Sequence, residues 1–242
     1  MLIAADDPRA VAVTAAIQSG DVGAVKAIMD QHDELASAQI GSEKDARSLL
    51  HILTDWPGHY PNNVETAKAL IAAGVDVNAA CINELHSETP LHYAASCDDV
   101  EILDILLDSG ADINASGGVI ADTPLADARA FLQLKCAHRL VERGATVALG
   151  DAATLGLIDR VKAFYAAGEQ PTKDVTSRAL WNACYGGQLE TAQYLHSLGG
   201  DVNAIPPWRP ETALDAAIRS KQSVDVVEWL RSIGAEETNK DE

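Results

Sequence analysis

Residues 86–120 contain the stretch that decides the fold, and it opens with TPLHYAA at Thr89–Ala95. Threonine is a good helix N-cap and proline suits the first helical position, so a short helix is predicted to begin here. A turn at 97–99 leads into VEILDILL, residues 100–107. Its apolar residues cover more than one face, which is typical of a helix buried among neighbours. Gly110 follows as the stop of this second helix.

The phrase that closes this stretch returns along the chain. It reads GADINA at 110–115, GVDVNA at 74–79 and GGDVNA at 199–204, with weaker copies at 144–147 and 234–236. Self-similarity of this kind predicts stacked units, because each unit buries its apolar face only against its neighbours.

The pattern of TPLHxAA, a second helix and GADINA closely resembles the ankyrin repeat, and the resemblance covers nearly the whole chain. It implies an all-α solenoid of about seven helix-turn-helix units with short β-hairpin fingers, forming a single domain over 1–242. The expected units lie near 8–41, 42–85, 86–120, 121–146, 147–172, 173–208 and 209–237, followed by a polar tail at 238–242.

Three departures from the repeat are predicted to shape the surface. The second unit carries an insertion within 55–63, where two prolines and a glycine indicate a rigid loop between its helices. Gly144 and Gly168 are only 24 residues apart, which leaves no room for a full hairpin between the fourth and fifth units. The connector 205–210 contains three prolines, so we expect a stiff finger there.

The charge balance is strongly acidic. The chain has 18 Lys and Arg against 36 Asp and Glu, a formal net charge of −18. Such a surface repels phosphate backbones, so nucleic acid is not an expected partner, and a basic protein partner is favoured. The acidity is also consistent with a role in solubility alone. We expect a monomer.

The cysteines and the apolar segments bear on location. Cys81, Cys97, Cys136 and Cys184 form no C-x-x-C pair, which is typical of reduced thiols in a cytoplasmic protein. No secretion signal is apparent at the start of the sequence, and no apolar run reaches the length of about 18 residues that a transmembrane helix needs. Cytoplasmic location without membrane association is therefore predicted.

The inserted loop is the first candidate binding site. A rigid loop with aromatic and polar side chains lies next to the equivalent turn of the third unit, where two aspartates stand. Together they could bind a cationic group through cation–π and carboxylate contacts. Alternatively, Trp56 and Tyr60 cover the edge of the stack. The candidate residues are Asp55, Trp56, His59, Tyr60, Asp98 and Asp99.

The second candidate site lies in the sixth unit and the finger after it. The resemblance implies binding through finger tips and first helices, and Trp, Tyr and Arg are frequent interface anchors. Trp208 and Arg209 lie on the stiff finger, and Trp181 and Tyr185 lie on the first helix. The competing interpretation is packing, with Trp208 lying on a neighbouring finger and Trp181 filling a space left by a shortened connector.

Histidines fill the fourth position of the opening motif in two units, as His51 and His92. The resemblance implies that such a histidine bridges backbone groups of neighbouring fingers. His51 and Asp55 are four residues apart and could form a polar cluster with His59, His86 and Asp98. No H-E-x-x-H or comparable spacing is present, so no metal and no cofactor are predicted.

The resemblance implies a non-catalytic scaffold that binds a protein partner on its concave surface of fingers and first helices. A neutralising partner of a toxin or secreted effector would be a special case. The alternative is a small-molecule-binding protein or an enzyme with a pocket near the loop 55–63 or near Trp181. A deep closed pocket would favour that alternative, and a broad open groove favours the scaffold.

Overall fold

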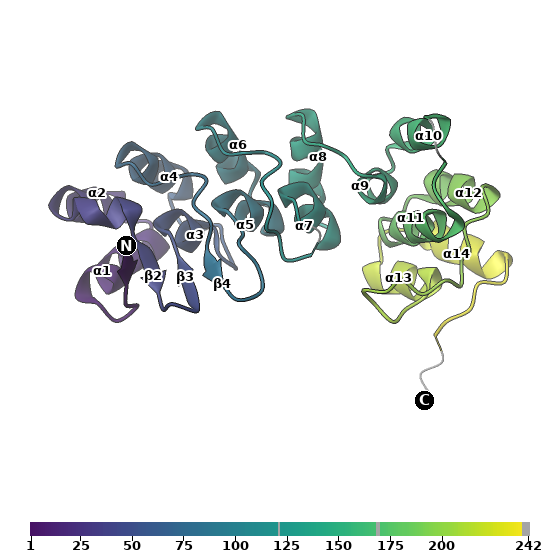
Figure 1. The fold of residues 1–242 in the computed structure, drawn as a ribbon, viewed down its shortest axis with the longest axis horizontal. Helices are drawn as coiled ribbons and strands as arrows, with labels where there is room; N and C mark the ends of the chain where they lie inside the picture. The colour runs from purple at the N-terminus through teal and green to yellow at the C-terminus, as the bar shows by residue number, and fades with distance from the viewer. Residues whose placement is uncertain (121, 168–169, 239–242) are drawn as a thin grey trace. The chain divides into compact units, whose positions relative to one another are not determined.

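The computed structural model describes residues 1–120, 122–167 and 170–238 (Figure 1). Across these ranges the α-helices follow one another in seven pairs, and each of the seven predicted units contains one pair. The helical repeat fold predicted from the sequence is confirmed. Contacts divide the chain into two compact units, 1–146 and 147–242, which are described one at a time. The single domain stays a prediction.

The unit 1–146 contains four helix pairs. They are α1 (Pro8–Ser19) and α2 (Val22–Gln31), α3 (Leu49–Thr54) and α4 (Asn63–Ala72), α5 (Pro90–Ser96) and α6 (Val100–Asp108), and α7 (Pro124–Ala130) and α8 (Leu134–Glu142), with a 3₁₀ helix η1 (Asp33–Ser37) after α2. The first helices pack in the order α1, α3, α5, α7, and the second helices pack in the order α2, α4, α6, α8 (Figure 1). The core lies between these two layers, where Leu91, Leu103 and Leu106 are fully buried.

The fingers of this unit carry a small sheet. Its strands are β1 (Leu2–Ile3), β2 (Gln39–Gly41), β3 (Asp45–Arg47) and β4 (Ile82–Asn83), in that order. β1 is parallel to β2, whereas β2, β3 and β4 are antiparallel, with Ile40 opposite Arg47 and Ala46 opposite Ile82. The sheet therefore joins consecutive fingers side by side.

The repeated Asp-x-Asn of the closing phrase links each finger base to the next. The Asp112 carboxylate accepts the Asn114 backbone N–H at 2.9 Å, which closes a local turn. The Asn114 side-chain oxygen then accepts the Thr146 N–H at 2.8 Å, as the Asn78 oxygen accepts the Asp112 N–H at 2.7 Å one unit earlier. The phrase recurs because each copy satisfies backbone groups of its neighbour.

The unit 147–242 contains three pairs. They are α9 (Leu149–Thr154) and α10 (Ile158–Ala166), α11 (Lys173–Tyr185) and α12 (Leu189–Ser197), and α13 (Ala213–Ser220) and α14 (Val224–Ser232). α11 packs against both α9 and α13, and α12 packs against α10 and α14. α11 begins after its N-cap Thr172, so helix occupies residues that the repeat frame places before the opening position Arg178.

The predicted departures are visible in the connections. Eight residues, 55–62, separate α3 from α4, against three, 97–99, between α5 and α6, so the predicted insertion is confirmed. Residues 143–148 join α8 to α9 without a strand. The expected closing glycine Gly168 and the tail 239–242 lie outside the described residues.

In the ranges that the structure covers, no helix combines the length and apolar character needed to span a bilayer.

Candidate functional site: a pocket between fingers and first helices

Two buried histidines hold the fingers in place. Each accepts, on Nδ1, the backbone N–H of its own helix N-cap residue, so Nε2 carries the hydrogen. His51 Nε2 donates to the Glu88 carbonyl at 3.0 Å, and His92 Nε2 donates to the Asp122 carbonyl at 3.2 Å. The predicted bridging role is confirmed. Burial lowers the pKa of His51 to about 4, so the ring stays neutral. The hydrogen bond from this ring to the Glu88 carbonyl anchors the backbone from which the Glu88 side chain projects.

Glu88 places a nearly buried carboxyl group between two fingers. The residue is only 7% exposed. Its Oε2 lies 2.9 Å from His86 Nδ1, and the Val119 backbone N–H also donates to its carboxylate. Burial first, and then the adjacent carboxyl of Asp127, raise the pKa of Glu88 to about 7. Glu88 therefore holds a proton in mildly acidic solution, next to the Asp127 carboxyl.

Asp127 is the fully buried member of this pair. It lies on α7, and its Oδ1 accepts the Ile120 N–H at 3.0 Å, so it holds the finger that carries Val119. In the repeat frame Ala126 stands where His51 and His92 stand, so the fourth unit lacks that histidine. Asp127 supplies a different anchor to the finger in its place.

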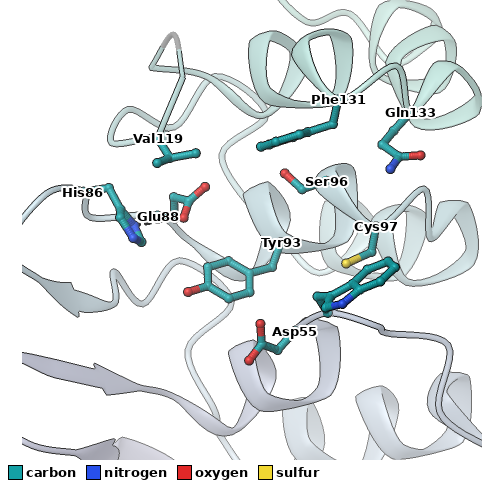
Figure 2. Close-up of a pocket in the computed structure, with 10 residues that line it drawn as sticks. Asp55, His86, Glu88, Tyr93, Ser96, Cys97, Val119, Phe131 and Gln133 are labelled. Carbon is teal, nitrogen blue, oxygen red and sulfur yellow. Dashed lines mark ion pairs between the residues drawn. The ribbon is translucent and has the colours of Figure 1, made fainter. Parts of the chain in front are cut away.

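A pocket of about 510 Å³ opens beside this carboxyl pair, and we call it the Glu88 pocket. Its lining comes from the inserted loop, two fingers, α5 and the end of α7: Asp55, Trp56, His86, Glu88, Tyr93, Ser96, Cys97, Val119, Phe131 and Gln133. Figure 2 shows the Tyr93 ring in the middle, with Asp55 on one side and Glu88 and Val119 on the other. Trp56 is 79% exposed, so its indole is available to a partner.

A second hollow of about 510 Å³ adjoins the first, and we call it the Tyr60 groove. It is lined by α1, by strands β2 and β3, and by Ile52, Asp55 and Tyr60. Asp55 lines both hollows and forms an ion pair with Arg47, which also lines the groove. Both hollows therefore lie on the side of the unit formed by fingers and first helices.

The other polar residues predicted for the loop site bond within the fold. Asp99 is buried at the N-cap of α6, where its carboxylate accepts the Ile102 N–H at 3.2 Å and the Asn63 amide at 2.9 Å. Asp98 accepts the Cys136 N–H at 2.9 Å. His59 Nε2 donates to the Cys97 carbonyl at 2.9 Å, which ties the loop to the next turn. The two turns are neighbours as expected, but Glu88 supplies the carboxyl of the Trp56 pocket.

The candidates in the unit 147–242 form an aromatic cluster. Trp181 and Tyr185 are only 4% and 8% exposed, and their rings stack with centroids 5.3 Å apart. The Trp181 indole N–H donates to the Glu211 carbonyl at 3.2 Å. Trp208 meets Trp181 edge-on at 6.1 Å and remains 50% exposed. Trp181 therefore packs inside the fold, and Trp208 and the exposed Arg209 form its outer surface.

Sequence reasoning missed Glu88 and Asp127, although the sequence holds a signal for the second. Asp127 occupies the fifth position of the opening motif, where Tyr93 stands in the third unit. A charge inside a motif that begins a buried helix is unusual, because an ionised carboxylate is costly to bury without a partner. Glu88 gives no such signal, since it precedes the motif and its burial depends on the next finger.

The cysteines near the pocket are poorly suited to nucleophilic chemistry. Burial raises the pKa of the Cys97 thiol to about 11, and burial also raises the pKa of Cys136. Within 1–120, 122–167 and 170–238, no group of three His, Cys, Asp or Glu side chains is arranged to hold a metal ion.

Comparison with known proteins agrees with the repeat architecture. The family model for ankyrin repeats (3 copies) matches residues 13–117 and 60–151, which together span more than half of the chain. The chain belongs to the ankyrin-repeat family. Ankyrin repeats are generally protein-interaction scaffolds.

The chain spans only a small part of the curated relatives that it matches. A putative ankyrin repeat protein of fowlpox virus is 41% identical over 58 residues, which cover 24% of this chain and 11% of the relative. An ankyrin repeat and KH domain-containing protein of Caenorhabditis briggsae is 29% identical over 187 residues, covering 74% of this chain and 7% of the relative. Among solved structures, the human ASB11 ankyrin repeat domain is similar with a TM-score of 0.47 and 28% identity, over 78% of this chain and 85% of that one.

Proposed function

We propose that this chain is a non-catalytic scaffold that binds a protein partner on the face formed by its fingers and first helices. The observation that carries the proposal is the position of the Glu88 pocket and the Tyr60 groove. Both hollows lie on this face of the unit 1–146, they adjoin at Asp55, and neither is lined by a second helix. A preformed surface of this kind binds with little rearrangement of the backbone.

The exposed aromatic residues support the same face. Trp56 is 79% exposed at the rim of the Glu88 pocket, and Phe131 is a further exposed apolar residue of its lining. A solvent-exposed indole buries a large area when a partner covers it, at a small cost in side-chain entropy. Trp208 offers the unit 147–242 a second anchor of this kind.

The charge of the chain supports a basic partner. With a net charge of −18, the surface attracts basic proteins and accelerates their encounter at low ionic strength. The partner is therefore expected to present a cationic surface, with apolar side chains that enter the two hollows.

The test is an affinity capture from a lysate of the source organism with the wild-type chain, Trp56→Ala and Leu198→Ala. Leu198 is a matched control, because it is an exposed apolar residue at the end of α12, a second helix. We expect a protein that wild type and Leu198→Ala retain and Trp56→Ala loses, with circular dichroism unchanged in all three. Equal retention by the wild type and both variants would place binding on another face.

A further inference from the structure

The Glu88 pocket concentrates aromatic side chains in a chain that has few of them. The whole sequence contains four Trp, five Tyr and two Phe, yet Trp56, Tyr93 and Phe131 all line this one pocket. They come from three elements distant in sequence: the inserted loop, α5 and the end of α7. Aromatic faces attract a cation held within about 6 Å and also cover the aliphatic stem that carries it.

The charged groups around the pocket are mostly acidic. Glu88 and Asp55 line it on opposite sides of the Tyr93 ring (Figure 2). The Asp127 carboxyl lies next to Glu88. The cations that face these carboxyls are Arg47, which pairs with Asp55, and His86, when it is protonated. Three carboxyls thus face one arginine and one histidine, so acidic groups outnumber cations around the pocket and favour a cationic ligand.

An unsatisfied hydroxyl adds a polar contact at the other end of the pocket. Ser96 Oγ is buried and has no hydrogen-bond partner among the described residues, although buried polar atoms rarely lack one. Ser96 lines the pocket beside Phe131 (Figure 2). A ligand with several N–H donors can form hydrogen bonds to this hydroxyl and to a carboxyl at the same time, whereas an apolar side chain can form neither.

We propose that the Glu88 pocket binds one cationic side chain, arginine or lysine, of the protein partner, with its aliphatic stem against Trp56, Tyr93 and Phe131 and its charge beside Glu88. This inference rests on the proposed scaffold function and names the chemistry of one of its contacts. The aromatic walls exclude water from the stem, and the buried carboxyl supplies the charge-assisted hydrogen bond. The pocket rejects an acidic residue, because that residue would lie beside the Glu88 carboxylate.

Binding of the cation is linked to proton release. The raised pKa of Glu88 means that its carboxyl holds a proton in mildly acidic solution. A cation next to Glu88 favours the ionised form and displaces that proton, so affinity rises with pH through neutrality. The groups that face this carboxyl are Asp127 and His86, and Asp55 on the opposite side is paired with Arg47.

The experiment is a titration of the ¹⁵N-labelled full chain with three capped tripeptides, followed by NMR at pH 8. Two contain a cation, acetyl-Leu-Arg-Leu-amide and acetyl-Leu-Lys-Leu-amide, and the third replaces it with neutral norleucine. We expect saturable shifts of the Trp56 indole and the Tyr93 amide with a cationic peptide, and binding at least about tenfold weaker with norleucine. At pH 6 the affinity for the cationic peptides should be lower than at pH 8 by at least about threefold.

Variants locate the charge. Glu88→Gln keeps the size and a donor toward Asp127, and is expected to weaken cationic peptide binding about tenfold. Glu101→Gln removes the same charge from an exposed position on α6, and should leave binding unchanged. Phe131→Ala removes an exposed aromatic ring from the pocket lining. Its effect on cationic peptide binding is the second readout should Glu88→Gln lose structure.

Three results would overturn the proposal: no pocket shifts with either cationic peptide, equal binding of norleucine, or equal weakening by Glu88→Gln and Glu101→Gln. These results leave the scaffold function standing if the captured partner still needs Trp56. Loss of the Trp56 dependence in the capture instead refutes the scaffold face, whatever the peptides do.

Discussion

Replacing Glu88 by glutamine should change how the stability of the chain depends on pH. The carboxyl pair of Glu88 and Asp127 is buried, and the pKa of Glu88 is raised from 4.5 to about 7. A raised pKa means that the folded protein holds a proton that the unfolded chain has already released. The stabilisation from this proton is fully present below about pH 4.5 and is lost as pH rises through about 7.

The size of the effect follows from the two pKa values. A shift of this size corresponds to about 3 kcal/mol in total, of which about 2 kcal/mol falls between pH 5.5 and 8. Glutamine has no proton to lose. Glu88→Gln should therefore become more stable relative to wild type by about 2 kcal/mol over that interval, because its amide still donates to Asp127 at every pH.

The assay is urea unfolding followed by circular dichroism at 222 nm, at intervals from pH 5.5 to 8. This interval avoids pH values near the sequence pI of 4.6, where a net charge close to zero promotes association. Glu101→Gln serves as the control and should follow the wild-type curve. Parallel curves for Glu88→Gln and wild type would refute the raised pKa of Glu88 and with it the electrostatic account of the pocket.

Three further predictions concern single residues. Asn114→Ala should cost about 1 kcal/mol and speed amide exchange at Thr146, whose N–H it binds; exchange measured by NMR checks this. Trp181→Ala should cost about 3 kcal/mol or more in urea unfolding, against less than about 1 kcal/mol for the half-exposed Trp208→Ala. Cys97 in the native chain should react with iodoacetamide at pH 8 at least about tenfold more slowly than free cysteine, by mass spectrometry, because its pKa is about 11.

Local sequence signals accounted for the helices and their turns. The Thr-Pro cap at residue 89 and the glycine at 110 bound one helix pair, and both signals act within a few residues. The eight-residue connection 55–62 could also be predicted from local signals, because proline and glycine exclude helix. The start of α11 was harder to predict. The repeat frame expects a connector at 173–178, but no glycine or proline in these residues marks one.

The candidate site was only partly readable from the sequence. Asp55 and Trp56 do line the same pocket, because both belong to the inserted loop. The carboxyl that faces them comes from Glu88, on a finger whose depth of burial is set by the next finger and by α7. Asp98 and Asp99 are close in sequence to the expected patch, yet their carboxylates satisfy backbone N–H groups of α6 and α8. Long-range packing decides such pairings, and spacing along the chain does not record it.

Hydrogen–deuterium exchange of the chain alone and saturated with its captured partner would test the scaffold account most directly. The account predicts protection on the finger and first-helix face of the unit 1–146, at the inserted loop 55–62 and at the finger 117–120, with no change along α2, α4 and α6. Protection confined to those second helices, with the loop and finger unchanged, would contradict it.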